Sequence, residues 1–431
     1  MPAARVLADF FDSVIVLEND TLPRDASPRP GTPQSRHLHA LLAGGQRALS
    51  TLFPGFEQSL IAAGTHSLSV SGDYWLERPG YEVYPQRDLG FRIYSMTRPL
   101  LEWVVRSHVT QIGNIEIREQ CKAQQLPTTA DGTAVRGVTC LYSNGETEEI
   151  PADLVIDASS HGQLTYNLLA ALGMPGPEET TVGVNMGYAT TVYEMPEDAS
   201  ANWKLVGTHP DPPRNRRSGL LTPIEGNGWI VALAGSHDGK PPDDEAGFLK
   251  YARQMRTPTL YKAIRGARRV LAITRYGFKA SRWRRFEKLE RFPANLIPFG
   301  DTICRFNPIY GQGMSVAAKE ACLLLDLLQA AAHQGQGFAS VPADFLAQAQ
   351  PIIDAPWGTA VIPDFLDPLT EGERPANLDD ALRFGTALIK VAYDDPAIHK
   401  LMLEVQHMLK PRSVLREPEI AARIEAEMAP V

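Results

Sequence analysis

The stretch of residues 294–318, ANLIPFGDTICRFNPIYGQGMSVAA, decides the fold of this chain. Its apolar start predicts a buried strand that delivers Gly300 and Asp301, and its apolar end predicts a helix from Gly313. The loop between them would present bare backbone N–H groups at the helix N-terminus, where the helix dipole favours negative charge. Asp301 is placed to accept hydrogen bonds from a polyol chain. An ordinary glycine-rich turn that caps a helix is the alternative.

An acidic residue closes the first apolar segment of the chain. Residues 3–11 predict a helix, and residues 13–20, SVIVLEND, predict a buried strand that ends at Glu18. An acid at the end of the second strand of a dinucleotide-binding fold binds a ribose, and a G-x-G-x-x-G turn lies about 20 residues before it. Counting back from Glu18 places those glycines before Met1, so we expect a truncated sequence that lacks the central first strand. The alternative for Glu18 is an exposed strand end.

A third motif lies in the middle of the chain. Residues 153–162, DLVIDASSHG, predict a buried strand that ends at Asp157. A hairpin is predicted just before it, in which Asn144 and Gly145 would supply the two positive-φ positions of a type I′ turn. A strand followed by Asp-Ala is common in α/β proteins, so this motif indicates little by itself.

The other segments predict a second domain with a mixed, more antiparallel sheet. Helices are expected over residues 38–52 and from Arg98, and an irregular stretch between them is rich in aromatic residues. We expect these aromatics to line a hydrophobic substrate chamber, with an ordinary core as the alternative. Strands are expected near residues 181–193, 217–224 and 228–235, helices near 244–254 and 258–265, and proline-broken helices beyond 341.

The composition excludes several classes of protein. The 431 residues carry 42 Lys and Arg against 50 Asp and Glu, a net charge of −8, with 44% hydrophobic residues and 4 Cys. This balance predicts about two or three domains with hydrophobic cores rather than a disordered, fibrous or disulfide-stapled chain. The sequence contains no apolar run of about 18 residues, so no membrane span is predicted. The start does not resemble a signal peptide, and the scattered cysteines favour a cytoplasmic location.

The motifs, in this order, resemble those of FAD-dependent monooxygenases of the aromatic hydroxylase and squalene epoxidase type. The resemblance runs from residue 1 to about 335, and residues 33–42, PQSRHLHALL, together with FNPIYGQGMSVAA, are most similar to bacterial epoxidase-like flavoproteins. It implies an α/β fold with a Rossmann-like, three-layer FAD-binding domain interleaved with a mixed-sheet substrate domain, plus a C-terminal helical subdomain. The implied boundaries are 1–65, 97–165 and 291–340 for the FAD-binding domain, 66–96 and 166–290 for the substrate domain, and 341–431 for the helical region.

The resemblance also implies roles for individual residues. Glu18 would hold the adenosine ribose, Arg36 and Arg98 would contact the ribose and pyrophosphate region, and Asp301 would bind the ribityl chain. The pyrimidine edge of the flavin would be faced by Gly311, Gln312, Gly313 and Met314. Further cofactor contacts would come from Gly300, Pro308 and Asp157. At Asp157 the sequence departs from the pattern, because Ala-Ser-Ser-His follows where many members have a glycine.

The implied function is epoxidation or hydroxylation of an apolar small molecule through a flavin C4a-hydroperoxide, with NAD(P)H and O2 as co-substrates. Because the flavin carries this chemistry, no catalytic residue is named. The alternatives are another FAD-dependent oxidation, such as dehydrogenation, or a truncated homologue without catalysis. A halogenase is disfavoured because its Trp-x-Trp-x-x-Pro signature is absent. The substrate, the choice of NADH or NADPH and the oligomeric state stay open.

Two local patterns suggest other ligands. His37 and His39 would face different directions on a helix, so no metal site is expected and we place them near the cofactor. Residues 279–286, KASRWRRF, interleave basic and aromatic residues as nucleic-acid binders do. The acidic total disfavours nucleic acid, so a solvated face or a transient contact with the phosphate of NAD(P)H is preferred.

Overall fold

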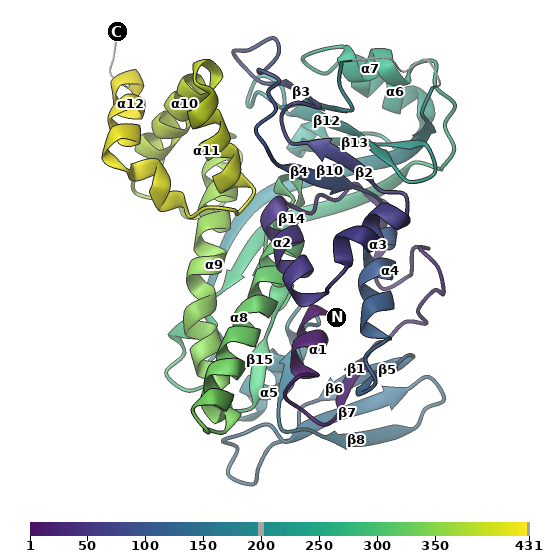
Figure 1. Ribbon diagram of the computed structural model, residues 1–431, viewed down its shortest axis with the longest axis vertical. Coiled ribbons are helices and arrows are strands. Elements are labelled where there is room, and N and C mark those ends of the chain that lie inside the picture. The colour runs from purple at the N-terminus through teal and green to yellow at the C-terminus, as the bar shows by residue number, and fades with distance from the viewer. Residues whose placement is uncertain (197–201, 429–431) are drawn as a thin grey trace.

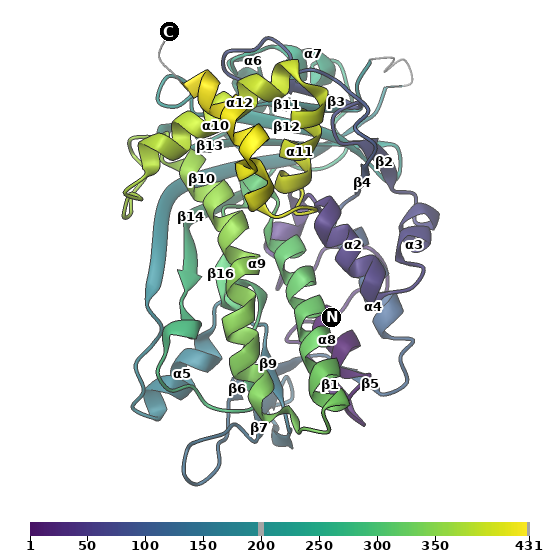
Figure 2. The ribbon, with the colours of Figure 1, turned by 60° about the vertical axis from the view of Figure 1, so that its left-hand side comes forward.

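The computed structural model describes residues 1–196 and 202–428. Figure 1 shows an elongated molecule with a large, mostly antiparallel sheet at its upper end and pairs of parallel strands nearer its lower end. Two long helices, α8 (Gly313–His333) and α9 (Val341–Asp364), pack against each other along the molecule (Figures 1 and 2). The predicted α/β fold class is confirmed.

Parallel strands form the middle layer of the lower part. β1 (Val14–Leu17) pairs with β5 (Ile115–Arg118), and β9 (Val155–Asp157) pairs with β15 (Leu296–Pro298). One side of this layer packs in the main core with α1 (Pro2–Leu7), α2 (Ala43–Leu52), α4 (Arg98–Val109) and α8. The other side packs on a three-stranded sheet of β6 (Cys121–Gln125), β7 (Gly137–Tyr142) and β8 (Thr147–Pro151). The three layers agree with the predicted arrangement.

The predicted hairpin is present as β7 and β8, but the predicted type I′ turn is wrong. Gly145 has a φ of 88°, whereas Asn144 is not among the described residues with positive φ. The N–H of Gly145 donates to the carbonyl of Tyr142 at 2.9 Å, as in a type I turn closed by a glycine bulge. The Asn144 side chain accepts the N–H of Glu146 at 2.9 Å, and this local bond favours the observed turn.

The upper part is built on a seven-stranded sheet in the order β16-β14-β10-β13-β12-β11-β3. The strands are β3 (Tyr74–Glu77), β10 (Glu179–Glu194), β11 (Leu205–Thr208), β12 (Arg217–Ile224), β13 (Gly228–Ser236), β14 (Thr274–Arg284) and β16 (Cys304–Arg305). β3 and β11 are parallel and the other neighbours are antiparallel. A separate core joins the sheet to α6 (Glu245–Arg253) and α7 (Thr259–Ile264).

The stretch before Arg98 is more regular than the sequence predicted. It contains α3 (Phe56–Ala62), β2 (His66–Ser69), β3 and β4 (Arg92–Ser95), with β2 antiparallel to β4. These strands have four residues each, and β3 pairs with a segment about 130 residues away, so their local pattern is weak. Tyr81 and Tyr84 pack against Tyr393 and His399. These two aromatics therefore fill a core, not the predicted chamber.

The C-terminal region is helical, as predicted, and consists of α9, α10 (Leu378–Asp394), α11 (Pro396–Gln406) and α12 (Pro418–Met428). α9 continues through Pro351 and Pro356, where a break was expected. Its buried Phe345 and Trp357 belong to the main core, and this burial offsets the hydrogen bonds that the prolines remove.

Two further boundaries position the site. The helix expected from residue 38 begins at Ala43, because the N–H of Leu42 donates to the hydroxyl of Ser315 on α8 at 3.0 Å. The helix after Asp157 is α5 (Gln163–Ala171). Within the described residues, no helix has both the length and the apolar character needed to span a membrane.

Candidate functional site

The turn of residues 300–302 lies at the carboxyl end of β15. Gly300 has a φ of 62°, a left-handed conformation that favours glycine. Its N–H donates to Oε2 of Glu320 on α8 at 2.8 Å. From β14, Nη1 of Arg284 donates to the carbonyl oxygens of Asp301 at 3.1 Å and Thr302 at 2.9 Å. Two buried ionisable side chains, Glu320 and Arg284, therefore hold this turn from different elements.

The carboxylate of Asp301 is free of donors from the part of the chain that the structure describes. Within residues 1–196 and 202–428, no group donates a hydrogen bond to it, and the side chain is exposed to solvent. The protein around it still raises the pKa of Asp301 by desolvation, against the opposing charges of Arg305 and Arg284. A Cβ atom added to Gly313 would lie 3.6 Å from Oδ1 of Asp301. The free carboxylate thus lies beside the first turn of α8.

The loop between Asp301 and α8 packs against the segment that leads into α2. Gly311 has a φ of 66°, and a Cβ atom there would lie 3.0 Å from Cβ of Ala40. Gln312 is buried at the N-terminus of α8, and its Oε1 has no hydrogen-bond partner among the described residues. Pro308 is exposed, while Met314 is half-buried. The loop therefore brings glycine backbone and an unpaired amide oxygen to the start of the helix.

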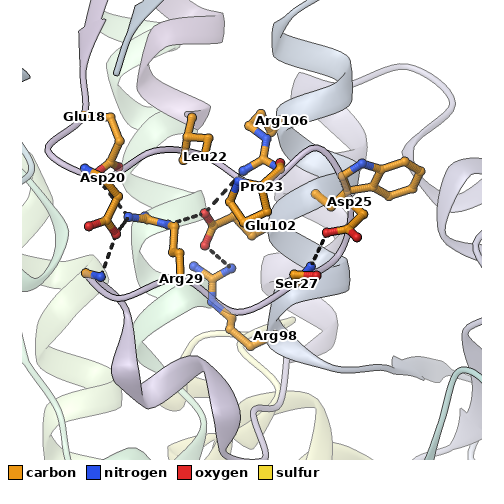
Figure 3. A network of polar contacts seen from close by, with 12 residues as sticks. Glu18, Asp20, Leu22, Pro23, Asp25, Ser27, Arg29, Arg98, Glu102 and Arg106 are labelled. Atoms are coloured by element: carbon orange, nitrogen blue, oxygen red, sulfur yellow. Dashed lines mark hydrogen bonds and ion pairs between the residues drawn. The ribbon is translucent and has the colours of Figure 1, made fainter. Parts of the chain in front are cut away.

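Glu18 and Arg98 meet in a network of charges at the end of β1 (Figure 3). Arg29 lies at its centre, with Nη1 3.1 Å from Oε1 of Glu18 and 2.8 Å from Oδ2 of Asp20, and with Nε 2.8 Å from Oε1 of Glu102. Glu102 also lies 3.7 Å from Nη1 of Arg98. No hydrogen bond among the described residues uses Oε2 of Glu18.

The charges of this network shift two pKa values in opposite directions. Burial works against the charge of Arg29, but Glu102, Glu18 and Asp20 outweigh it and raise the pKa. For Arg98, burial is the dominant cause and lowers the pKa despite the nearby Glu102. Arg98 is thus a guanidinium whose charge is less well compensated than that of Arg29.

Arg36 and Asp157 differ in how much they offer to a ligand. Arg36 is exposed in a short turn of residues 33–36 and has no ion-pair partner among the described residues. Asp157 is buried, and its oxygens accept the N–H of Ser159 at 3.1 Å and the hydroxyl and N–H of Thr165 at 2.6 and 3.3 Å. Asp157 therefore shapes the loop before α5, and its contact with a cofactor stays a prediction.

Sequence reasoning missed the residues that support the site. Glu320 is a buried acid within an apolar helix, and that pattern was the available signal. Arg284 lies in the basic and aromatic run that was interpreted as a solvated face, but it is only 5% exposed. Arg29 lies in a polar, proline-rich loop that gave no signal. No cluster of His, Cys, Asp and Glu suited to a metal ion occurs in the described part of the chain.

Solved structures share this fold over most of the chain. The flavin-dependent brominase Bmp2 aligns with a TM-score of 0.68 and 12% identity over 99% of this chain and 94% of that chain. The p-nitrophenol 4-monooxygenase PnpA from Pseudomonas putida DLL-E4 aligns with a TM-score of 0.64 and 16% sequence identity over 95% of both chains. PqsL, a probable FAD-dependent monooxygenase from Pseudomonas aeruginosa, aligns with a TM-score of 0.61 and 15% sequence identity over 89% of this chain and 95% of that chain. The fold is that of flavin-dependent monooxygenases.

A curated relative identifies the family more narrowly. Protein Rv3254 of Mycobacterium tuberculosis (strain ATCC 25618 / H37Rv) is 33% identical over 335 residues, which cover 76% of this chain and 70% of that protein. The chain belongs to the family of Protein Rv3254. No family model matches the sequence.

Proposed function

We propose that this chain is an FAD-dependent monooxygenase that epoxidises or hydroxylates an apolar small molecule with NAD(P)H as the reductant. The observation that carries the proposal is the free carboxylate of Asp301 beside the N-terminus of α8. The shared fold with flavin-dependent monooxygenases supports it. When bound, the flavin would supply the activation of O2, which protein side chains do not provide.

The residues present fit an FAD. Asp301 and Oε2 of Glu18 are acceptors without donors among residues 1–196 and 202–428, as the hydroxyl groups of a ribityl chain and a ribose require. Oε1 of Gln312 is a buried acceptor without a partner in the described part of the chain, and a flavin N–H would satisfy it. Arg98 and the exposed Arg36 would contact the ribose and pyrophosphate region.

The backbone before and at the start of α8 would provide most of the remaining cofactor contacts. Gly300 and Pro308 shape the turns on either side of Asp301, and residues 311–314 would bring N–H groups to the pyrimidine edge. At that position the positive end of the helix dipole would stabilise the negative charge of a reduced flavin. Asp157 would act through the loop before α5, whose Gly162 approaches Thr302.

The surface that faces this loop supports an apolar substrate. Met186, Tyr188 and Phe278 on β10 and β14 belong to the same core cluster as Phe306 of the loop. A cavity of about 190 Å³ beside these strands is lined by Met186, Tyr188 and Tyr276, together with Lys240 and Arg275. Its aromatic wall suits a planar apolar ligand, and the two cations would tolerate an acidic group.

The first test is the binding of FAD by variants of Asp301. We expect Asp301→Ala to weaken FAD binding by about 10- to 100-fold, because it removes a charged acceptor of ribityl hydrogen bonds. Fluorescence titration with FAD measures the dissociation constant, and the visible absorbance of the purified protein reports bound flavin. Asp326→Ala, at an exposed acid on α8, is the matched control. Equal affinities for parent and Asp301→Ala would show that Asp301 is not the ribityl site.

The second test separates oxygenation from dehydrogenation. Turnover of a panel of aromatic and alkene compounds with NAD(P)H and isotopically labelled O2 should place label in the product. A product that is oxidised but unlabelled would identify a dehydrogenase. Bound FAD without NAD(P)H oxidation, with or without these compounds, would favour a non-catalytic homologue.

A further inference from the structure

A buried polar network joins the C-terminal end of α9 to the loop before α8. Oδ1 of Asp364 accepts hydrogen bonds from Nδ2 of Asn307 at 3.0 Å and from the hydroxyl of Tyr310 at 2.8 Å. The hydroxyl of Tyr188, on β10, donates to Oδ1 of Asn307 at 3.2 Å. Asp364 belongs to the helical region, outside every residue predicted for the site.

The backbone fixes the direction of these hydrogen bonds. The N–H of Ile309 donates to Oδ1 of Asn307 at 3.3 Å. A backbone N–H can only donate, so this oxygen is the acceptor and the amide Nδ2 must face Asp364. The donors of Asn307 and Tyr310 therefore both point at one oxygen of Asp364, where the network ends.

The surroundings of Asp364 favour its neutral form. The titratable groups that face it are Tyr310 from the loop and Tyr188 from β10, with Tyr276 of β14 beside Tyr188, and no cation of the described residues pairs with it. Burial raises the pKa of Asp364 to about 7, against the hydrogen bonds from Tyr310 and Asn307. Its second oxygen, Oδ2, is buried and has no partner among the described residues, which costs least when that oxygen carries a proton.

We propose that Asp364 is a positioning residue that holds residues 307–313 in place as a neutral acid with its proton on Oδ2. This inference rests on the proposed function, because these residues form the loop that would face the flavin. Asn307 caps the turn of residues 308–310, which ends at the left-handed Gly311. Ionisation would leave a buried charge with no pairing cation from the described residues, so residues 307–313 would loosen as the pH rises.

Hydrogen exchange of the loop tests this role without any cofactor. In Asp364→Ala, we expect the backbone amides of residues 306–313 to exchange about 10-fold faster, because Asn307 and Tyr310 lose their acceptor. Asp364→Asn keeps the Oδ1 acceptor and replaces the protonated oxygen by an NH2 group, so its exchange should stay within about 2-fold of the parent. Asp354→Asn, at an exposed acid of α9, is the control.

The pH dependence of FAD binding distinguishes positioning by a neutral acid from simple packing. Between about pH 6 and pH 8 the FAD dissociation constant of the parent should rise about 10-fold as Asp364 ionises. In Asp364→Asn the FAD dissociation constant should not change with pH over this range, and in Asp354→Asn it should change with pH as in the parent.

Each outcome has a defined meaning. Loop exchange in Asp364→Ala that equals the parent, or loosening in Asp364→Asn as large as in Asp364→Ala, would overturn the inference. So would an Asp364→Asn variant with the same pH dependence as the parent. If the parent binds no FAD at any pH, the proposed function fails, and the exchange experiment still decides whether Asp364 positions the loop.

Discussion

Glu320 lies directly beneath the turn that presents Asp301, and its charge state matters for stability. Burial raises its pKa to about 7, while the N–H of Gly300 opposes the shift. A folded-state pKa above the unfolded value means that the folded protein binds the proton more tightly. The stability from this proton is present at acid pH and is lost as the pH rises through about 7.

The matching prediction concerns Glu320→Gln. The amide oxygen of Gln can still accept the N–H of Gly300, but the side chain no longer titrates. Relative to this variant, the parent should lose about 1–3 kcal/mol of unfolding free energy between about pH 5 and pH 8. Urea unfolding across that range measures the difference, and Asp326→Asn on the exposed face of α8 should leave the pH dependence unchanged. Parallel curves for the parent and Glu320→Gln would refute this account.

At the level of elements, α2 approaches the start of α8 closely enough to exclude a side chain. A Cβ atom at Gly45 would lie 2.6 Å from Cα and Cβ of Ser315, which leaves no space for a methyl group. Helix propensity alone would favour alanine over glycine by about 1 kcal/mol. The packing and the propensity therefore predict opposite signs for the same substitution.

We expect the packing to dominate at Gly45. Gly45→Ala should destabilise the protein by about 1–3 kcal/mol, because the two helices must move apart. Gly385 in α10 has open space around it, so Gly385→Ala should stabilise by up to about 1 kcal/mol. Thermal or urea unfolding of both variants gives the sign of each change in unfolding free energy. A stabilised Gly45→Ala would contradict the prediction and show that α2 and α8 separate easily.

The same elements show what the sequence could predict. The strand, the Gly-Asp turn and the helix of residues 294–333 were predictable because their apolar pattern and glycine positions are local. β3 was not predictable, because its apolar pattern covers only four residues and the strand is stabilised by pairing with the distant β11. The proposed roles of Arg284, Glu320 and Asp364 likewise depend on partners in other elements, which lie 17, 20 and 54 residues away. For Glu320 the sequence shows an acid within an apolar helix, but the burial of Glu320 and Asp364 is seen only in the structure.

On the scale of the whole molecule, one ion pair ties the C-terminal region to the large sheet. Arg216 precedes β12, and its Nε and Nη2 donate to the two carboxylate oxygens of Asp367 at 2.6 and 3.0 Å. Both side chains are largely buried, with 13% and 7% exposure. Burial alone would raise the pKa of Asp367, but the hydrogen bonds from Arg216 hold it below its usual value.

Removal of this carboxylate should weaken the whole molecule. Asp367→Ala removes the bidentate partner of Arg216, which keeps only the contact of its Nη1 with the exposed Asp238 at 3.2 Å among the described residues. We therefore expect a loss of about 3 kcal/mol in unfolding free energy, the lower end for a broken buried pair. The pair of Arg214 and Asp211 is a natural control, because Arg214 is 79% exposed and Asp211→Ala should cost less than about 1 kcal/mol. Chemical denaturation measures both, and similar small losses would mean that the pair adds little to the docking of the helical region.

The parallel edge of the large sheet has a consequence for synthesis of the protein. β12 and β13 are joined by a tight turn and can pair as soon as both have been made. β3 must instead wait for β11, whose Thr208 lies 131 residues after Glu77. At roughly 5–20 residues per second, that wait is on the order of ten seconds on the ribosome. During this interval the newly made segment of residues 74–77 has no strand partner, so slower translation would lengthen the time in which chaperones must protect it.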